Sequence, residues 1–238
     1  MIAVIGGTGT TGKHVVAELQ KRNADFCCIV RDEAKARAIM GDDVRLVTGD
    51  ISDAASIEEG CVGCDALFLL SPHNPTLGQQ QSNTIDTAKR AGVTRIVKLA
   101  GMMTNPEMQI PAQHGIAERH LQDSGTVWTI IRPNFFMQNL LNAAPTVKAQ
   151  GKIVMPFPAD LPIGMIDARD SAEVCALALL EEGQAGQIYE LTGALVTLND
   201  AAAALSDALG KEIPYIQAPI EAAQKIIRDQ GAPDWAAE

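Results

Sequence analysis

The sequence has no excess of positive charge and no long apolar run. Its 238 residues include 19 Lys and Arg against 29 Asp and Glu, which gives a formal net charge of -10. Nucleic-acid binding needs a basic surface to neutralise phosphates, so this balance argues against a nucleic-acid partner. No stretch approaches the ~20 apolar residues of a membrane span. The apolar run Ile2–Ile5 follows Met1 directly, without a signal peptide, and we therefore expect a cytoplasmic protein with no membrane partner.

The chain also lacks an even set of cysteines that disulfides would pair. The five cysteines are Cys27, Cys28, Cys61, Cys64 and Cys175. Their number is odd and two of them lie in one strand-like run, so we do not expect a secreted disulfide framework. Cys61 and Cys64 have the spacing of a redox motif or half a zinc site, but they precede a strand and no second Cys or His pair lies at a suitable distance. We expect structural cysteines and no metal site.

Short apolar runs alternate regularly with segments of helical period through the first 131 residues. The apolar runs predict strands at residues 2–5, 26–30, 44–47, 66–70, 95–99 and 127–131. The intervening segments predict helices at residues 13–21, 33–39, 54–59, 79–91 and 115–123. Continuous apolar strands separated by helices are typical of repeated βαβ units. The sequence therefore predicts an α/β protein with a doubly wound parallel sheet.

A glycine-rich turn follows the first predicted strand and precedes the first predicted helix. Gly6, Gly9 and Gly12 stand three residues apart, where the usual dinucleotide fingerprint has G-x-G-x-x-G. The physical logic is shared, because glycines allow a tight turn, close backbone approach to a pyrophosphate and close packing of helix on strand. We expect a Rossmann fold whose pyrophosphate-binding residues are Gly6, Thr8, Gly9, Thr10, Thr11 and Gly12.

The end of the second strand predicts the choice of cofactor. Arg31 stands where an acidic residue would accept hydrogen bonds from the ribose of NAD, and Lys35 adds positive charge nearby. An arginine at this place pairs with a 2'-phosphate, so NADP(H) is preferred over NAD(H). The alternative is that Arg31 is an ordinary solvated residue at a strand end.

The ends of the third and fourth strands supply further candidates, because ligands of doubly wound sheets lie outside the carboxyl ends of the strands. We expect Asp50 to accept a hydrogen bond from the adenine amino group and Ile51 to cover the adenine ring; a loop cap is an equal alternative for Asp50. The fourth strand ends in the remaining cofactor candidates of this edge, which are Leu70, Ser71 and Pro72.

Residues 133–238 follow a different pattern. Four prolines cluster between residues 145 and 162, and residues 151–238 carry 5 basic and 14 acidic side chains. The remaining segments predict a helix at 170–180, a strand at 187–191 and a helix at 199–209. We therefore predict a Rossmann domain at residues 1–132 and a small C-terminal α/β lobe at residues 133–238, on the substrate side and interleaved with the first domain.

An ordered series of motifs resembles the NmrA-like family of atypical short-chain dehydrogenases, whose members include bacterial quinone and triphenylmethane reductases. The motifs lie at residues 6–12, 30–32, 49–50, 114–125, 131–136, 166–170 and 189–193. The resemblance implies that Arg31 contacts a 2'-phosphate and that Pro133, Asn134 and Phe135 border the cofactor. It also places Phe136 next to the substrate.

The chain lacks the Tyr-x-x-x-Lys pair of the classical relatives, because neither Tyr189 nor Tyr215 is followed by Lys four residues on. The resemblance implies that His114 with Glu118 stands in its place, as in the quinone-reducing members. We expect His114 and His73 to donate hydrogen bonds to the reduced acceptor, with Lys98 adding positive charge. A histidine of ordinary pKa, about 6.5, suits proton delivery near neutrality. His73, Phe136 and Met137 are the candidates for the acceptor pocket. The alternatives are that His73 is an ordinary loop residue and that the consecutive aromatic residues belong to the hydrophobic core.

These observations favour an NADPH-dependent oxidoreductase that transfers hydride to a quinone or another conjugated planar acceptor, because such acceptors do not require a strong general acid. The alternative is a non-catalytic NADP(H)-sensing regulator of the NmrA type. An epimerase on the same scaffold ranks lower, since its usual acid-base tyrosine is absent. The partner is a small molecule, and the protein is expected to be a monomer or homodimer.

Overall fold

The computed structural model describes residues 1–102, 107–229 and 235. The chain forms two compact units: Met1–Asn134 with Ala168–Leu191, and Phe135–Asp167 with Thr192–Glu238. The first unit therefore takes two separate stretches of the chain. The division differs from the one predicted at residues 132 and 133, because the helix and strand at residues 168–191 return to the first unit.

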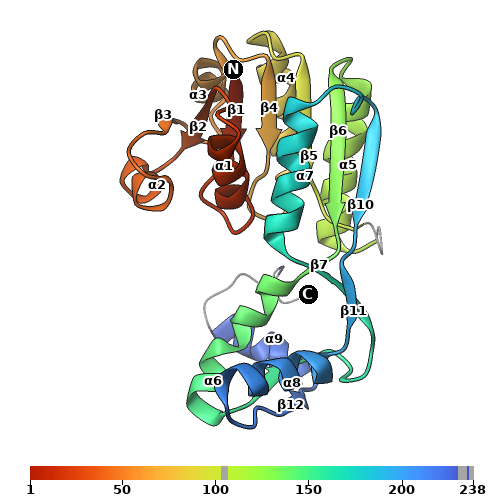
Figure 1. Ribbon diagram of the computed structural model, residues 1–238. Helices are drawn as coiled ribbons and strands as arrows, with labels where there is room; N and C mark the ends of the chain where they lie inside the picture. Colours follow the sequence, from red (N-terminus) through yellow and green to blue (C-terminus); the bar gives the residue numbers. More distant parts are fainter. Residues whose placement is uncertain (103–106, 230–234, 236–238) are drawn as a thin grey trace. The chain divides into compact units, whose positions relative to one another are not determined.

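The first unit contains a seven-stranded sheet in the order β10-β6-β5-β4-β1-β2-β3 (Figure 1). Its strands are β1 (Ile2–Ile5), β2 (Phe26–Val30), β3 (Arg45–Thr48), β4 (Ala66–Leu69), β5 (Arg95–Leu99), β6 (Val127–Pro133) and β10 (Gln187–Leu191). All neighbouring strands pair in parallel. The predicted doubly wound α/β fold is confirmed, and the strand order reverses at β1.

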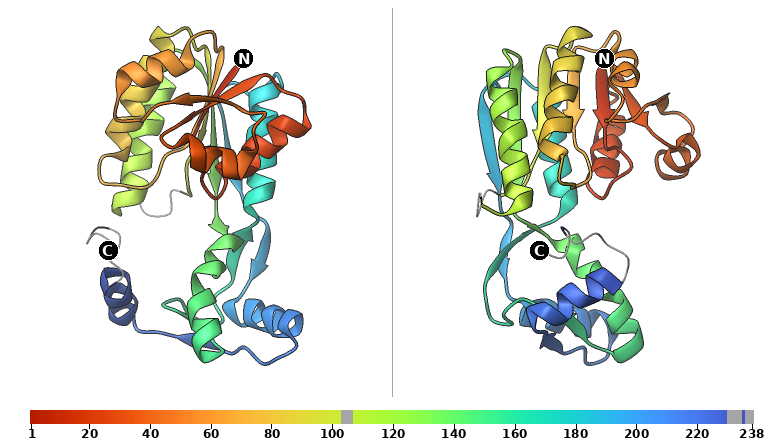
Figure 2. Two further views of the ribbon diagram at one scale, coloured as in Figure 1. Left: turned by 90° about the vertical axis from the view of Figure 1, so that its left-hand side faces the viewer. Right: turned by 180° about the vertical axis from the view of Figure 1, so that it is seen from behind.

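Helices cover both faces of this sheet (Figure 2). They are α1 (Gly12–Lys21), α2 (Glu33–Met40), α3 (Ala54–Cys61), α4 (Leu77–Arg90), α5 (Gln109–Asp123) and α7 (Ala168–Leu180). The predicted start of α5 at residue 115 is wrong by six residues, because Pro111 lies in the first turn of the helix, where no intrahelical N–H is needed. Asp32 and Asp53 cap α2 and α3, since each carboxylate accepts a hydrogen bond from a backbone N–H two or three residues on.

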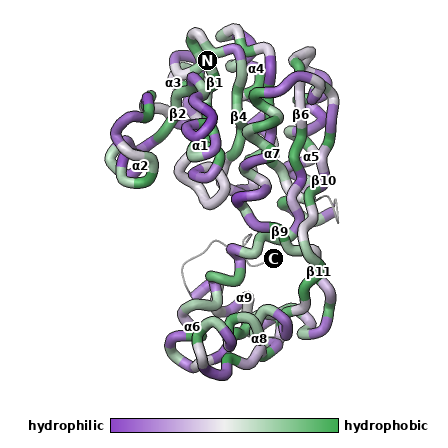
Figure 3. The backbone as a smooth tube through the Cα atoms, in the orientation of Figure 1, coloured by the Kyte–Doolittle hydropathy of each residue, from purple (hydrophilic) through white to green (hydrophobic). Residues whose placement is uncertain are grey.

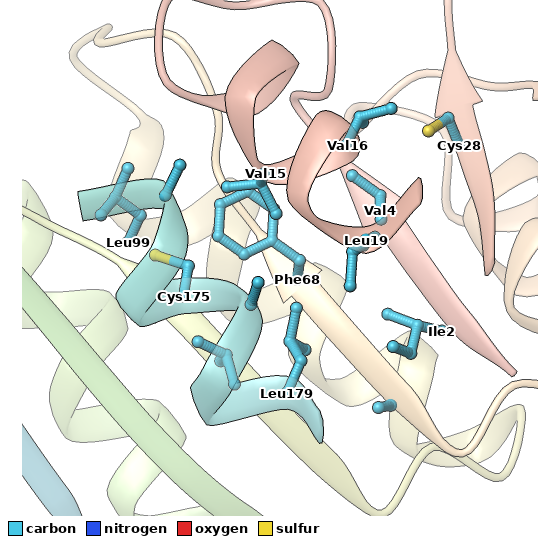
Figure 4. Close-up of a cluster of buried hydrophobic side chains, with 14 of the residues drawn as sticks. Ile2, Val4, Val15, Val16, Leu19, Cys28, Phe68, Leu99, Cys175 and Leu179 are labelled. Atoms are coloured by element: carbon cyan, nitrogen blue, oxygen red, sulfur yellow. The ribbon is translucent and has the colours of Figure 1, made fainter. Parts of the chain in front are cut away.

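The sheet has a hydrophobic core on each face. Figure 4 shows the first, in which side chains of β1, β4, α1 and α7 gather around the fully buried Phe68. The second core joins the opposite face to α3, α4 and α5 through Ile57, Ile85 and Leu121. Burial of one such side chain contributes about 1.5–3 kcal/mol. Central strands are accordingly apolar along their length, as the green trace of β4 in Figure 3 shows.

All five cysteines are buried and free of disulfides. The thiol of Cys64 contacts the thiol of Cys27, with 4.0 Å between the two Sγ atoms. The hydrogen bond from Cys64 lowers the pKa of the Cys27 thiol to about 7, while burial raises the pKa of Cys28 to about 12. Among the described residues, no three His, Cys, Asp or Glu side chains gather as metal ligands would.

The second unit has its own small core, formed by Ala143, Ile153, Ala202 and Ile213. Its strands form a three-stranded sheet in the order β11-β9-β7 and a pair β12-β8. These strands are β7 (Phe135–Phe136), β8 (Ile153–Met155), β9 (Ile163–Ile166), β11 (Ala194–Val196) and β12 (Tyr215–Gln217). The helices are the 3-10 helix η1 (Met137–Ala143), α6 (Ala144–Gln150), α8 (Leu198–Leu209) and α9 (Ile220–Asp229). Across the part of the chain that the structure describes, no helix has the length and apolar character to cross a membrane.

Candidate cofactor and active site

The glycine-rich turn joins β1 to α1 and leaves no room for side chains at two of its glycines. A Cβ at Gly12 would lie 2.0 Å from the carbonyl oxygen of Gly6. Gly6 has a φ of +81°, and a Cβ there would lie 2.4 Å from the carbonyl oxygen of Leu70. Gly9 is exposed and donates its N–H to Gly6. The turn therefore holds β1, α1 and the end of β4 tightly together and keeps its outer backbone accessible.

The amino end of α1 carries no acidic side chain in its first turn. Thr10 is exposed, Thr8 is half-buried and Thr11 is buried at the helix start without capping it through its side chain. Backbone N–H groups at the start of a helix attract anions. This arrangement fits a pyrophosphate at the predicted turn residues.

Arg31 and Asp50 lie at the carboxyl ends of the adjacent strands β2 and β3. Arg31 Nε is 3.8 Å from Asp50 Oδ2, and the Arg31 side chain is 73% exposed. Asp50 Oδ1 accepts hydrogen bonds from the hydroxyl and the N–H of Ser52, which, with the nearby Arg31, hold the pKa of this carboxyl below its ordinary value. Asp50 therefore caps the loop that follows β3, which is the alternative considered for it above, and its Oδ2 atom faces Arg31. Asp32 is occupied by the N–H of Lys35 at the start of α2, and Lys35 itself is exposed.

A hollow of about 150 Å³ opens beside Ile51, between α3 and α4. Its lining combines Ile51 and Ile57 with the side chains of Ser52, Gln80, Asn83 and Thr84. The hollow places an apolar wall and amide groups side by side, and these are groups that can contact the face and the polar edge of an adenine ring.

Leu70, Ser71 and Pro72 follow β4, next to the glycine-rich turn. Leu70 touches Gly6 as described above. Ser71 is buried, and its Oγ accepts a hydrogen bond of 2.9 Å from Nε2 of the fully buried Gln81 on α4. The Ser71 hydroxyl keeps its proton for another partner. Sequence reasoning missed Gln81, because it stands in a run of three glutamines and the buried face of α4 also holds Ser82, Thr84 and Thr87.

The structure brings the candidates Lys98, His114 and His73 together in one cluster. Lys98 lies in the middle of the sheet on β5 and is fully buried. Its Nζ is 3.0 Å from Nδ1 of His114, which is 2% exposed on α5. The ring of His73, in the exposed segment after β4, packs edge-on against the His114 ring with 5.2 Å between the centroids.

The charges of this cluster differ from the ordinary values. Burial lowers the pKa of Lys98 to about 7, opposed by Glu118 and reinforced by Arg132. Burial, then Lys98 and His73, lower the pKa of His114 to about 2. Partial desolvation and Lys98 also lower the pKa of His73. The ordinary histidine pKa on which we based proton delivery therefore does not apply to His114, which is neutral near pH 7.

Glu118 and Arg132 act electrostatically on Lys98, and of these two only Glu118 was identified from the sequence, as the companion of His114. Arg132 on β6 donates two hydrogen bonds to the carboxylate of the buried Glu118 on α5. The distances are 2.6 Å between Nη2 and Oε2 and 3.4 Å between Nε and Oε1. Arg132 also pairs with Glu190 on β10 at 3.3 Å. The signal was the placement of Glu118 four residues after His114, which puts both on one face of α5.

The remaining candidates divide between the two units. Pro133 and Asn134 belong to the first: the Pro133 carbonyl accepts a hydrogen bond from Met102 N–H, and Asn134 donates its N–H to Leu191. Phe135, Phe136 and Met137 belong to the second unit. Phe135 contacts Phe157 edge-on at 6.0 Å, and both Phe136 and Met137 are half-buried there.

Residues 1–237 match the NmrA-like family. The chain belongs to this family. It is 36% identical over 241 residues to the NAD(P)H azoreductase of Xenophilus azovorans, covering 100% of this chain and 84% of that protein. It is 32% identical to quinone oxidoreductase 2 of Escherichia coli (strain K12), covering 100% of this chain and 85% of that protein.

A solved structure has the same architecture. The NADPH-dependent quinone oxidoreductase of Escherichia coli, solved in complex with NADPH, matches with a TM-score of 0.85 at 30% identity, covering 100% of this chain and 85% of that one. The family resemblance predicted from the ordered motifs is therefore confirmed, as is the Rossmann-like fold.

Proposed function

We propose that this NmrA-like protein is an NADPH-dependent oxidoreductase that transfers hydride to a quinone or a similar conjugated planar acceptor. The reductase relatives over the whole chain support the reaction class. The glycine cradle supports the cofactor, because a Cβ at Gly6 or Gly12 would fill space that the turn occupies and the outer backbone stays open to a pyrophosphate. Bound NADPH supplies the hydride from its nicotinamide.

The proposed cofactor-binding residues lie in the first unit. The turn from Gly6 to Gly12 holds the pyrophosphate, and Arg31 with Lys35 binds the 2'-phosphate, which gives the preference for NADP(H). Asp50 and Ile51 bind the adenine. The other cofactor contacts of this unit are Leu70, Ser71, Pro72, Pro133 and Asn134, and His73 lies at the acceptor.

The buried cluster of Lys98 and His114 is the observation that favours catalysis over cofactor sensing. Burying ionisable side chains such as those of Lys98 and His114 destabilises a protein. A sensor that only binds NADPH gains nothing from a polar cluster at the carboxyl end of β5, whereas a reductase needs hydrogen-bond donors for the oxygen that gains charge. We assign this role to His114 and His73, with Lys98 behind them.

The location is part of the proposal. Five free cysteines in the first unit suit the reducing environment of the cytoplasm.

The deciding experiment measures NADPH oxidation by the purified protein with a panel of simple quinones and one azo dye. We expect turnover with at least one quinone and slower turnover with NADH as donor. A calorimetric titration with NADPH runs in parallel. Tight NADPH binding without turnover on any acceptor would favour the NADP(H)-sensing regulator instead.

A further inference from the structure

Lys98 contacts the ring nitrogen of His114 that faces the sheet. The distance between Nζ and Nδ1 is 3.0 Å, and the other hydrogen bond of Nζ goes to the carbonyl oxygen of Leu99 at 3.5 Å. Both contacts fit a lysine that donates, because an ammonium group has donors and no acceptor. Nδ1 must then accept. Since a neutral imidazole carries one proton, that proton sits on Nε2.

The Nε2 atom of His114 is buried and, within the residues described, has no hydrogen-bond partner. Buried donors without partners are rare in proteins and destabilise them. A bound acceptor oxygen would satisfy this donor. Because His114 stays neutral near pH 7, it resembles other active-site histidines that polarise an oxygen as imidazole rather than imidazolium.

Resting on the proposed function, we infer that Lys98 holds His114 as the Nε2-protonated tautomer and replaces the proton that His114 gives to the reduced acceptor. Lys98 is thus a positioning residue and proton reservoir that acts through His114. His114 is the group that touches the acceptor.

The proton balance of the step is simple. Hydride addition leaves one oxygen of the quinone with a negative charge. The Nε2–H bond of His114 breaks as an O–H bond forms on that oxygen, and Nδ1 takes a proton from Lys98 Nζ. The ring stays neutral as the other tautomer, Lys98 becomes an amine, and one proton from water restores both groups. The sum is NADPH, quinone and one proton giving NADP and hydroquinone.

Three titratable groups, Glu118, Arg132 and His73, face this pair from three parts of the chain. Glu118 on α5 raises the pKa of Lys98, while Arg132 on β6 lowers it. His73, after β4, and Lys98, on β5, both lower the pKa of His114. Since Arg132 occupies both carboxylate oxygens of Glu118, Glu118 stabilises the Lys98 charge only in part. Lys98 is left able to lose its proton near pH 7, as a reservoir must.

The first test reads the tautomer without any turnover. In ¹⁵N-histidine-labelled protein free of cofactor, the Nδ1 resonance of His114 should shift with a midpoint near pH 7 as Lys98 loses its proton. In Lys98→Met the same resonance should stay constant from pH 6 to 9, because the ring itself does not titrate there. No transition in the wild type, or an identical transition in Lys98→Met, would overturn the inference.

The second test is the pH profile of kcat at saturating NADPH and quinone. The wild-type kcat should fall above about pH 7, whereas Lys98→Met should show a kcat at least tenfold lower, a nearly unchanged KM and no such fall. The exposed Lys89→Met on α4 serves as the matched control and should behave as the wild type. A wild-type protein without quinone turnover contradicts the proposed function. A turning-over wild type whose profile Lys98→Met reproduces overturns this inference alone.

Discussion

Arg31 and Asp50 form an ion pair at the edge where the cofactor phosphate is expected, with 3.8 Å between Nε and Oδ2. The pair is loose and largely exposed, so it contributes little to stability. Asp50 is held in place by Ser52 rather than by Arg31. The guanidinium is therefore free to turn from the carboxylate to a phosphate, a bidentate partner of higher charge.

Replacement of Arg31 by alanine should remove the preference for NADPH. A hydrogen bond to a charged group contributes about 1.5–3 kcal/mol; exposure of Arg31 favours the lower end, which corresponds to about a tenfold loss of NADPH affinity. The NADH affinity should change less than about twofold. Isothermal titration calorimetry with both cofactors measures the two affinities. Arg45→Ala is the charge-matched control, because Arg45 lies at the amino end of β3, away from Asp50. Equal affinity of the wild type for both cofactors would refute the 2'-phosphate argument.

Two alanine substitutions in the glycine-rich turn should separate folding from binding. Gly12→Ala forces a Cβ to within 2.0 Å of the Gly6 carbonyl oxygen, so we expect a loss of about 2 kcal/mol or more in stability. A Cβ at the exposed Gly9 lies 3.3 Å from the same oxygen and needs only a small adjustment. Gly9→Ala should therefore keep the melting temperature within a few degrees but weaken NADPH and NADH binding alike. Unchanged binding by folded Gly9→Ala would exclude the turn as the pyrophosphate site.

Loss of the Glu118 charge should destabilise the protein much more than loss of the Glu190 charge. Removing one partner of a buried ion pair costs about 3–5 kcal/mol. Arg132 is 18% exposed and keeps Glu190 as a partner, so for Glu118→Gln we expect about 3 kcal/mol. Glu190→Gln removes a carboxylate that is 54% exposed and should cost no more than about 1 kcal/mol. Urea denaturation of both variants gives the comparison, and similar losses would contradict it.

Lys98 should make the stability of the protein depend on pH. Its folded pKa of about 7 lies below the ordinary 10.5, so between these values the unfolded chain binds a proton that the folded chain does not. Stability therefore rises with pH across this window, and the full penalty applies below about pH 7. We expect Lys98→Met to be more stable than the wild type at pH 7, with a difference that shrinks towards pH 9. Parallel stability curves for the two proteins would show that Lys98 does not titrate in this range.

The individual helices and strands of the first unit could be predicted, because each is marked by residues within or next to it. The strand at residues 26–30 and the helix starting at Glu33 follow from apolar runs, glycines and caps. The helix predicted at 79–91 is found at Leu77–Arg90. By contrast, the return of α7 and β10 to the sheet depends on packing with α1 and pairing with β6, which no local pattern records.

The candidate site shows the same limit. The residue types of Lys98 and His114 marked them from the sequence, but their 3.0 Å contact and the resulting neutral ring depend on how α5 packs against β5. The sequence places Glu118 beside His114 but does not predict its pair with Arg132, because that pair joins a helix to a strand.

The path of the chain also sets the order in which the ribosome can complete the sheet. Residues 135–167 emerge after β6 and before α7 and β10, so the nascent first unit must wait for them. Until then Phe68, Leu99 and Ile131 lack the cover that α7 provides. A fragment ending at Asn134 would expose this apolar face and aggregate. The cofactor-binding unit therefore cannot be separated from the rest of the protein by a single cut.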